Sequence, residues 1–498
     1  MAPSQAMRVL LGLGASALAL WTYVLLFVLS IRSGSFFRKP SEKETNELAI
    51  ARDRLWNLTK SPLPGFFHHF YRLHNGPLKD LDLQLHYVAN QEPRTQSGNL
   101  VILIHGFPDS YAMWNHLLQE PSIPIEEATY VAVDLPGYGG SDSLPKSDTM
   151  VLEALAEFIV AMREMFLKDD RTQNTYVVAH DWGGVLANRL AADAAVLADR
   201  FIIVNGPSSD LMRANGTQIF ESSRKIFKQF RQAPWTNFGC LTKSIKTVSP
   251  VLRQLLMSGY IFAFNLPAFM VKYLGTGGNM AFIRGVNAIQ LREKKPSLFK
   301  PEGLATILGP SVAECEATSS NGVNGANAKV YGPTVVQRAK SPGTHFLSMT
   351  SYYRDGPASK PWHKSLELIA DLHAIDSAAS ESSSPARRRS SSSTSSALFT
   401  PQVRGMLHAP TTVIWGEKDV ALGRQLCLDG LDGLLPKDSE VILLPRSGHW
   451  TPLEPQSRAA IAKVVGMYAI EKNNMLTGKP MTQHAAHVYE GATQMVKK

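Results

Sequence analysis

The sequence contains few cysteines and few charges. The three cysteines, Cys240, Cys315 and Cys427, are odd in number and widely spaced, which argues against a disulfide framework and against a zinc site. Only 19% of the residues are charged, and the net charge of +9 is scattered without a nucleic-acid-binding motif, so we expect no nucleic-acid partner. The hydrophobic share of 44% over 498 residues predicts a globular protein with a large core.

A charge-free hydrophobic run occupies residues 9–29. About twenty apolar residues are enough to cross a bilayer core as a helix. A cleaved signal peptide is the alternative, but the run is longer than a usual signal core and no small-residue cleavage site follows it. We therefore predict a retained single-pass anchor, residues 1–32, with membrane lipid as its partner.

Basic residues indicate the orientation of this anchor. They gather after the run, with Arg8 before it and Arg32, Arg38, Lys39 and Lys43 behind it. The positive-inside rule then leaves the large domain in the cytosol. Two glycosylation sequons, at Asn57 and Asn215, would be usable only on the lumenal side, and we give the charge asymmetry more weight.

Strand-like and helix-like segments alternate after residue 82. The strand candidates are residues 83–89, 100–104, 130–133, 176–179, 201–204, 411–415 and 441–444. Several are continuous runs of Val, Ile and Leu, which is typical of strands covered on both faces. The pattern predicts an α/β fold with a mostly parallel sheet flanked by helices.

The alternation stops between the strands at 201–204 and 411–415, and we expect a helical lid there. The expected divisions of the chain are an anchor (1–32), a lead-in segment (33–82), a first core part (83–206), the lid (207–376), a second core part (401–472) and a loose C-terminal tail (473–498). Polar, low-complexity composition predicts a disordered insertion near 315–345 and a Ser/Arg-rich disordered insert at 377–400.

An aspartate stands where one buried strand turns directly into a helix, in Ala179-His180-Asp181-Trp182-Gly183. A nucleophile elbow needs small residues on both sides, because the strand and helix backbones nearly touch there. The bend exposes its side chain at the carboxyl end of the sheet, where ligands bind. Helix N-capping is the structural alternative, but a cap requires neither the alanine nor the glycines.

Three further strand ends carry groups that complete such a site. After the strand at 100–104, the backbone N–H of Phe107 can form an oxyanion hole with that of Trp182, while His105 is more consistent with a structural role. Asp419 and His449 follow the strands at 411–415 and 441–444. The chain order of nucleophile, acid and histidine is that of an α/β-hydrolase triad.

These motifs resemble those of the α/β-hydrolase epoxide hydrolases, and most of all the membrane-anchored animal-type members. The matching stretches are HGFP (105–108), DLPGYGGSD (134–142), HDWGG (180–184), WGEKD (415–419) and GHW (448–450). We assign Asp134 a role in its turn rather than in catalysis. The resemblance implies the α/β-hydrolase fold with an inserted lid, no cofactor or metal, a hydrophobic epoxide substrate and the endoplasmic reticulum membrane.

The resemblance also implies a mechanism. Asp181 would attack a carbon of the epoxide ring and form an alkyl–enzyme ester. His449, held by Asp419, would then activate a water molecule against that ester. This mechanism requires a neutral imidazole within one water molecule of Asp181.

Two lid tyrosines bind the epoxide oxygen in the family. Tyr260 matches the first by the aromatic run and Leu-Pro that follow it, and Tyr353 matches the second because it directly precedes an arginine. Tyr352 is the neighbouring alternative. The chain departs from the family pattern at Ser351, where Asn is usual, and at Asp109, where Glu is usual.

We therefore predict an epoxide hydrolase that forms a vicinal diol from a lipid-like or xenobiotic epoxide, in lipid metabolism or detoxification. A haloalkane dehalogenase would use the same triad, but Phe107 occupies the place of a halide-binding residue and only Trp182 remains. An inactive hydrolase fold kept as a binding or scaffold protein is a second alternative. It predicts eroded triad positions, whereas all three are present.

Overall fold

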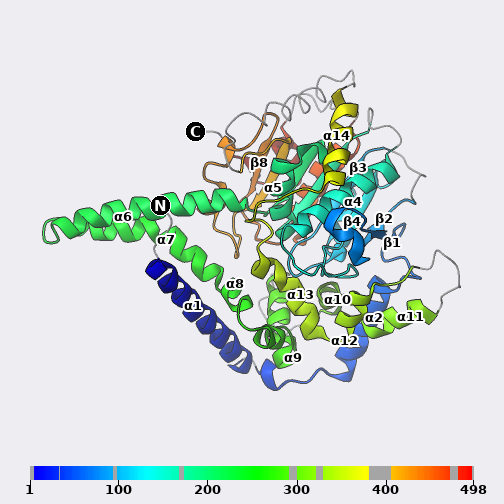
Figure 1. Ribbon diagram of the computed structural model, residues 1–498, viewed down its shortest axis with the longest axis horizontal. Helices are drawn as coiled ribbons and strands as arrows, with labels where there is room; N and C mark the ends of the chain where they lie inside the picture. Colours follow the sequence, from blue (N-terminus) through cyan, green and yellow to red (C-terminus); the bar gives the residue numbers. More distant parts are fainter. Residues whose placement is uncertain are drawn as a thin grey trace.

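A nine-stranded sheet forms the centre of the computed structural model, which describes residues 5–32, 34–92, 98–167, 173–290, 300–320, 329–380, 405–471 and 480–495 (Figure 1). The strands are β1 (Phe67–Arg72), β2 (Gln84–Ala89), β3 (Leu100–Ile104), β4 (Thr129–Val133), β5 (Thr175–His180), β6 (Arg200–Val204), β7 (Thr411–Gly416), β8 (Glu440–Leu444) and β9 (Thr493–Gln494). Their order is β1-β2-β4-β3-β5-β6-β7-β8-β9. The six strands from β4 to β8 in that order pair in parallel, and antiparallel strands close both edges.

Helices cover both faces of the sheet and form the inserted lid. The described α-helices are α1 (Gln5–Arg32), α2 (Glu42–Trp56), α3 (Asn115–Leu118), α4 (Met150–Phe166), α5 (Trp182–Asp193), α6 (Ser209–Gln232), α7 (Phe238–Met257), α8 (Gly259–Phe264), α9 (Ala268–Gln290), α10 (Pro301–Leu308), α11 (Val312–Ser320), α12 (Pro333–Lys340), α13 (Pro342–Asp355), α14 (Leu366–Ser380), α16 (Arg424–Leu428), α17 (Pro455–Ala469) and α18 (Met481–Ala486).

The continuous apolar strands divide their side chains between two cores. On β3, Ile102 packs into the core that contains α4, whereas Leu103 packs into the core that contains α17. Successive side chains of a strand point to opposite faces, so a strand covered on both sides must be apolar throughout. The seven strands predicted from the sequence and the mostly parallel sheet are confirmed.

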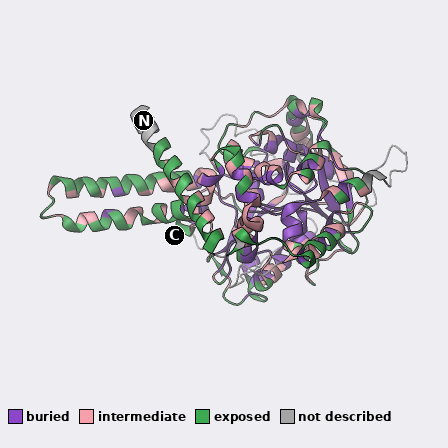
Figure 2. Cartoon of the chain, turned by 90° about the horizontal axis from the view of Figure 1, so that it is seen from below, coloured by how far each residue is buried: buried purple, intermediate pink, exposed green. Residues whose placement is uncertain are grey.

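The lid lies between β6 and β7 in the chain, and most of its described residues are helical. Helices α8, α9, α10, α12 and α13 lie together beside the core, below the sheet in Figure 1. Helices α6 and α7 pack against each other as a long antiparallel hairpin that projects from the body. Figure 2 shows that this hairpin is largely exposed, whereas the body has a buried interior.

Two segments are more ordered than the composition predicted. The expectation of disorder near 315–345 is corrected, because α12 and the start of α13 fall within it and Tyr331 and Val335 bury their side chains against Cys315. Residues 321–328 lie outside the described residues. Residues 381–400 of the Ser/Arg-rich insert predicted at 377–400 also lie outside them, and α14 continues to Ser380.

The edges of the sheet also differ from expectation. The supposed loose tail supplies α18 and the edge strand β9, and Met481, Ala485 and Tyr489 are buried against the core. The lead-in segment supplies the opposite edge strand, β1, which pairs with β2. These polar segments owe their order to pairing with an existing sheet edge, which is a long-range effect.

Helix α1 contains a stretch, Gly12–Arg32, that is long and apolar enough to cross a membrane, and only 6% of its most apolar window is buried. It packs along α8 of the lid. The contact is close at Gly259, where an added Cβ would lie 3.0 Å from Oγ1 of Thr22. The anchor candidate and the lid are therefore in direct contact.

Candidate active site

Asp181 occupies a strained bend between β5 and α5. Its backbone has φ 50° and ψ −116°, a left-handed φ that a non-glycine residue adopts only when its surroundings impose it. A Cβ on Gly183 would lie 2.5 Å from the carbonyl oxygens of both Ile104 and His105. The Asp181 side chain makes no capping hydrogen bond to α5, so the N-cap alternative does not describe its position.

The structure brings the three predicted triad residues together. Nε2 of His449 lies 3.3 Å from Oδ2 of Asp181, and Nδ1 of His449 lies 2.7 Å from Oδ2 of Asp419. The second contact means that His449 donates Nδ1–H to Asp419, which directs Nε2 toward Asp181. The His449–Asp181 contact is direct, whereas the sequence analysis expected an intervening water molecule.

Charge pairing determines the protonation of this triad. Burial alone would lower the pKa of His449, but the Asp419 charge, followed by the hydrogen bonds that His449 donates to Asp181 and Asp419, raises it to about 10. Burial alone would raise the pKa of Asp181, but the hydrogen bond and charge of His449 lower it. These pKa directions favour an imidazolium paired with a carboxylate in the resting site, whereas the mechanism implied by the resemblance uses a neutral imidazole at ester hydrolysis.

Asn205 supports the triad and was missed by the sequence analysis. Its Nδ2 donates to Oδ2 of Asp419 at 2.8 Å, and its Oδ1 accepts from Gly416 N at 3.1 Å and from Thr451 Oγ1 at 3.2 Å. Its φ is positive, at 43°. The only available signal was its position at the carboxyl end of β6 before a glycine.

Two backbone loops hold the carboxylates. Phe107 N donates to Oδ1 of Asp181 at 2.7 Å, in the direction required of an oxyanion-hole donor. Trp182, the second predicted donor, is the first residue of α5 and follows Asp181 directly. Oδ1 of Asp419 accepts from the N–H groups of Ala421 at 2.7 Å and Leu422 at 2.9 Å, which orients this carboxylate toward His449.

The two predicted lid tyrosines lie over the elbow. The Tyr260 and Tyr353 rings have centroids 6.0 Å apart, and the Tyr353 ring contacts Trp182 edge-on at 5.0 Å and Phe107 at 5.3 Å. Burial raises the pKa of both phenols, and the Asp181 charge contributes further. Both are therefore protonated at neutral pH and available as hydrogen-bond donors.

Tyr352 points elsewhere. Its hydroxyl donates to the Pro136 carbonyl at 2.9 Å, and its side chain is fully buried. The structure thus distinguishes the two adjacent tyrosines: Tyr353 faces the elbow, and Tyr352 joins the lid to the 134–142 loop.

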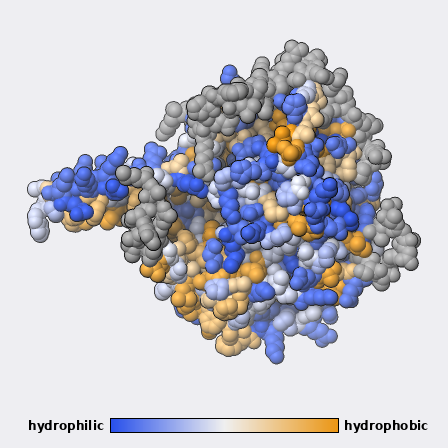
Figure 3. Space-filling view, viewed as in Figure 1, coloured by the Kyte–Doolittle hydropathy of each residue, from blue (hydrophilic) through white to orange (hydrophobic). Residues whose placement is uncertain are grey.

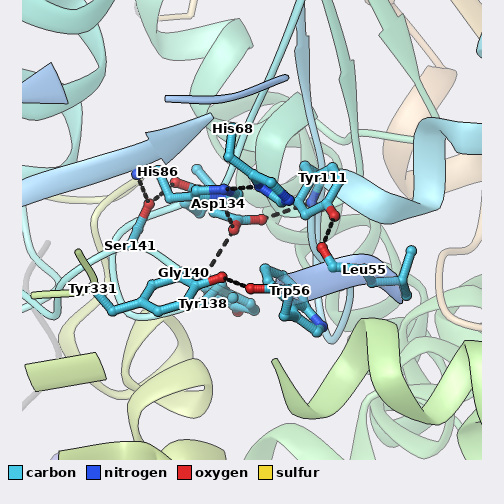
Figure 4. Close-up of polar contacts among 12 residues, drawn as sticks. Leu55, Trp56, His68, His86, Tyr111, Asp134, Tyr138, Gly140, Ser141 and Tyr331 are labelled. Atoms are coloured by element: carbon cyan, nitrogen blue, oxygen red, sulfur yellow. Dashed lines mark hydrogen bonds and ion pairs between the residues drawn. The ribbon is translucent and has the colours of Figure 1, made fainter. Parts of the chain in front are cut away.

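A buried polar network fixes that loop behind the site (Figure 4). Oδ2 of Asp134 accepts from Gly140 N at 2.8 Å and pairs with Nδ1 of His86 at 2.8 Å, while Oδ1 accepts from Tyr111 N at 2.7 Å. Nε2 of His86 in turn lies 2.8 Å from Nδ1 of His68. These contacts are consistent with the expectation that Asp134 stabilises its turn and takes no part in catalysis.

His105 is also held structurally. It is fully buried, its Nδ1 lies 2.8 Å from the Gly106 carbonyl, and its Nε2 accepts from Leu135 N at 3.0 Å. Both ring nitrogens are thereby occupied. His105 joins the oxyanion loop to the 134–142 loop and does not face Asp181 with a free nitrogen.

Asp109 forms a second acidic position next to the triad. Its Oδ1 accepts from Gln290 Nε2 at 2.8 Å, and its Oδ2 accepts from the Trp450 indole at 3.1 Å. Burial raises the pKa of Asp109 to about 7, with its two hydrogen bonds opposing the shift. A cavity of about 800 Å³ reaches Asp109 and Gln290 from the side of α3 and α10.

The sheet order, the strained bend at Asp181 and the contacts among Asp181, His449 and Asp419 are those of an α/β-hydrolase fold with an aspartate at the bend. Residues 99–234 match the family described as alpha/beta hydrolase fold. "Epoxide hydrolase 3" of Xenopus tropicalis is 30% identical over 154 residues, which are 30% of this chain and 39% of the relative. "Epoxide hydrolase 4" of Mus musculus is 30% identical over 161 residues, 32% of this chain and 42% of the relative.

The predicted resemblance to the α/β-hydrolase epoxide hydrolases is confirmed by these matches. The chain spans about two fifths of the length of the curated relatives it matches. Among solved structures, the Cif epoxide hydrolase from Acinetobacter nosocomialis aligns with 86% of this chain and 97% of its own, at 15% identity and a TM-score of 0.48. A likeness of that degree carries no information about the reaction.

Proposed function

We propose that this protein is an epoxide hydrolase that converts an epoxide and water to a vicinal diol, with Asp181 as the nucleophile. The observation that carries the proposal is the arrangement around one carboxylate. Asp181 is paired with His449 at 3.3 Å, and two protonated phenols, Tyr260 and Tyr353, face it from the lid. A nucleophile opposite two proton donors suits the opening of a strained ether ring.

Ring opening begins with Oδ2 of Asp181, because Oδ1 is held by the Phe107 N–H. Oδ2 forms a bond to one ring carbon while the carbon–oxygen bond breaks and its electron pair stays on the epoxide oxygen. Tyr260 or Tyr353 gives that oxygen a proton. The imidazolium of His449 then restores the phenol's proton, because esterification removes the charge and the hydrogen-bond acceptor that Asp181 contributed to the raised pKa of His449.

Ester hydrolysis follows from the neutral His449. Its Nε2 takes a proton from water, and the hydroxide adds to Cγ of Asp181. The oxyanion that forms is stabilised by the Phe107 and Trp182 N–H groups. The intermediate collapses by breaking the bond between Cγ and the alkyl oxygen. The leaving alkoxide takes the proton of the newly added hydroxyl group, which releases the diol and leaves Asp181 as a carboxylate beside the imidazolium of His449, so the protons balance over one cycle.

A single-turnover isotope experiment tests this route. With protein in excess over styrene oxide in H₂¹⁸O, the first diol should contain no ¹⁸O, and the peptide containing Asp181 should gain one ¹⁸O. Direct attack of water on the epoxide would place ¹⁸O in the first diol and leave Asp181 unlabelled. That outcome would overturn the covalent mechanism, and failure to form diol from several epoxides would overturn the function.

We further propose that α1 anchors the protein in the endoplasmic reticulum membrane with the catalytic domain in the cytosol, and that the substrate is lipid-like or xenobiotic. The side-chain amide of Asn215, in the second sequon, donates to the Leu426 carbonyl at 3.0 Å and the Asp429 carbonyl at 2.8 Å. A glycan there would break both contacts, in accordance with a cytosolic location. Protease digestion of sealed microsomes should remove the catalytic domain if this orientation is correct.

A further inference from the structure

The α6–α7 hairpin is held together near its middle by small polar residues. Ser223 Oγ and Ser244 Oγ lie 2.9 Å apart, and each hydroxyl also contacts the other residue's carbonyl. The base of the hairpin packs on α16. The outer surfaces of both helices are left exposed along most of their length (Figure 2).

One face of this hairpin carries large exposed apolar side chains. Each residue turns a helix by about 100°, so positions seven apart lie on one face. On α6 this places Phe220 with Phe227, and on α7 it places Phe238, Ile245 and Leu252 in one row. These five exposed side chains turn to the same face of the antiparallel pair when Ser223 and Ser244 face each other.

The hairpin tip extends this face with an aromatic residue. Trp235, in the turn between the helices, is 97% exposed. Tryptophan at an exposed tip is costly in water, and its amphipathic ring favours the headgroup region of a bilayer.

The same hairpin is strongly basic. Residues 209–257 contain eight basic and two acidic residues, a net charge of +6 out of +9 for the whole chain. All eight basic side chains are exposed, namely Arg213, Arg224, Lys225, Lys228, Arg231, Lys243, Lys246 and Arg253. An amphipathic helix that combines Phe and Trp with Lys and Arg is typical of a segment that lies on an anionic membrane surface.

We propose that the α6–α7 hairpin docks on the surface of an acidic lipid bilayer through the face that carries Phe227 and Ile245. The hairpin and α1 lie on the same side of the molecule in Figures 1 and 2, so one membrane can contact both. Figure 3 shows hydrophobic side chains over the region of α1 and α9 and along the lower edge of the hairpin. The anchor and the hairpin thus make two separate contacts with the same lipid surface.

Site-specific fluorescence in the full-length protein tests the docking. Ser222 and Ile245 flank the Ser223–Ser244 pair, are both exposed and turn to opposite faces of the hairpin. In a Cys240→Ser background, Ile245→Cys and Ser222→Cys would each carry the same environment-sensitive label. The remaining cysteines, Cys315 and Cys427, are buried and protected from labelling.

The labelled proteins would be reconstituted into phosphatidylcholine vesicles with or without 30% phosphatidylserine, at about 0.15 M salt. Nitroxide-labelled lipid should quench the label at position 245 at least about threefold more than the label at position 222 when phosphatidylserine is present. Removing phosphatidylserine or adding about 1 M salt should reduce that difference, because the basic residues supply the attraction.

Two outcomes would overturn the proposal. Equal quenching at both positions would show that the hairpin does not rest on the bilayer through this face. The label at position 245 would also be examined in detergent without lipid. If it is shielded from water there, and the shielding grows with protein concentration, a second copy of the chain covers the face instead. Epoxide turnover, measured in the same samples, reports the proposed function separately, since no hairpin substitution here touches the triad.

Discussion

Nε2 of His449 lies 3.3 Å from Oδ2 of Asp181, and this contact joins the proposed nucleophile to the imidazole. This pair performs two different tasks in the proposed cycle, because ring opening uses the carboxylate and ester hydrolysis uses the imidazole. Removing the imidazole should therefore stop the cycle at a defined point.

His449→Gln should form the ester but fail to hydrolyse it. We expect diol formation to fall by at least about 10³-fold, as for loss of a general base in other triads. Intact-protein mass spectrometry should show a gain equal to one epoxide, located on the peptide containing Asp181. The double variant with Asp181→Ala should show no gain, and an adduct that persists in it would contradict the assignment.

The two adjacent tyrosines of α13 should behave differently. Tyr353→Phe, like Tyr260→Phe, removes a proton donor and should slow ester formation about tenfold or more in rapid-quench experiments. Tyr352→Phe loses only the hydrogen bond to the Pro136 carbonyl. It should leave the ester-formation rate nearly unchanged and lower the free energy of unfolding by about 1 kcal/mol. If Tyr352→Phe slows ester formation and Tyr353→Phe does not, Tyr352 is the proton donor and the assignment of Tyr353 is wrong.

Asp109 should make stability depend on pH. Its pKa of about 7 lies above the ordinary 3.8, so the folded chain holds a proton that the unfolded chain releases. The resulting stabilisation is fully present below about pH 4 and is lost as the pH rises through 7. Between pH 5 and 7, Asp109 should account for a loss of roughly 2 kcal/mol in the free energy of unfolding.

Asp109→Asn removes that titration. Urea unfolding of the variant should show a shallower fall in stability between pH 5 and 7 than the unchanged protein shows. The free energy of unfolding of the variant at a single pH does not report this titration, because asparagine can accept only one of the two hydrogen bonds that Asp109 accepts. Equal slopes for the two proteins would mean that Asp109 is ionised throughout this range.

Gln254 connects the lid to the acid of the triad. Its Oε1 accepts from Gly423 N at 2.6 Å and its Nε2 donates to the Ala421 carbonyl at 2.8 Å, within the loop whose N–H groups hold Asp419. Gln254→Ala should lower kcat about tenfold with little change in KM and should shift the pH profile, because His449 loses its oriented acid. Ser249→Ala on the same helix is the control and should change neither quantity.

The triad was predictable because each member follows a strand whose apolar run is unmistakable in the sequence. Parallel strands bring their carboxyl ends to one edge, so Asp181, Asp419 and His449 had to lie near one another. The choice between Tyr352 and Tyr353 rested on the family pattern, and the structure supplies the physical reason in the different contacts of the two rings.

Contacts between distant segments were not predictable. Asn205 and Gln254 act through neighbours more than 160 positions away in the chain, and nothing local marks them as part of the site. The raised pKa of His449 was not predicted either, because it depends on the summed charge of two carboxylates. Segment β1 lacks an aliphatic pattern and becomes a strand only by pairing with β2.

The close packing of α1 on α8 affects how this protein can be handled. Tyr260 belongs to α8, and the neighbouring Gly259 leaves space for Thr22 of α1. Deleting the first 32 residues to obtain soluble material would expose the outer side of the helix that presents this phenol. Weak turnover by such a shortened chain would then reflect a missing wall of the lid, so kinetic work should retain α1 in detergent or lipid.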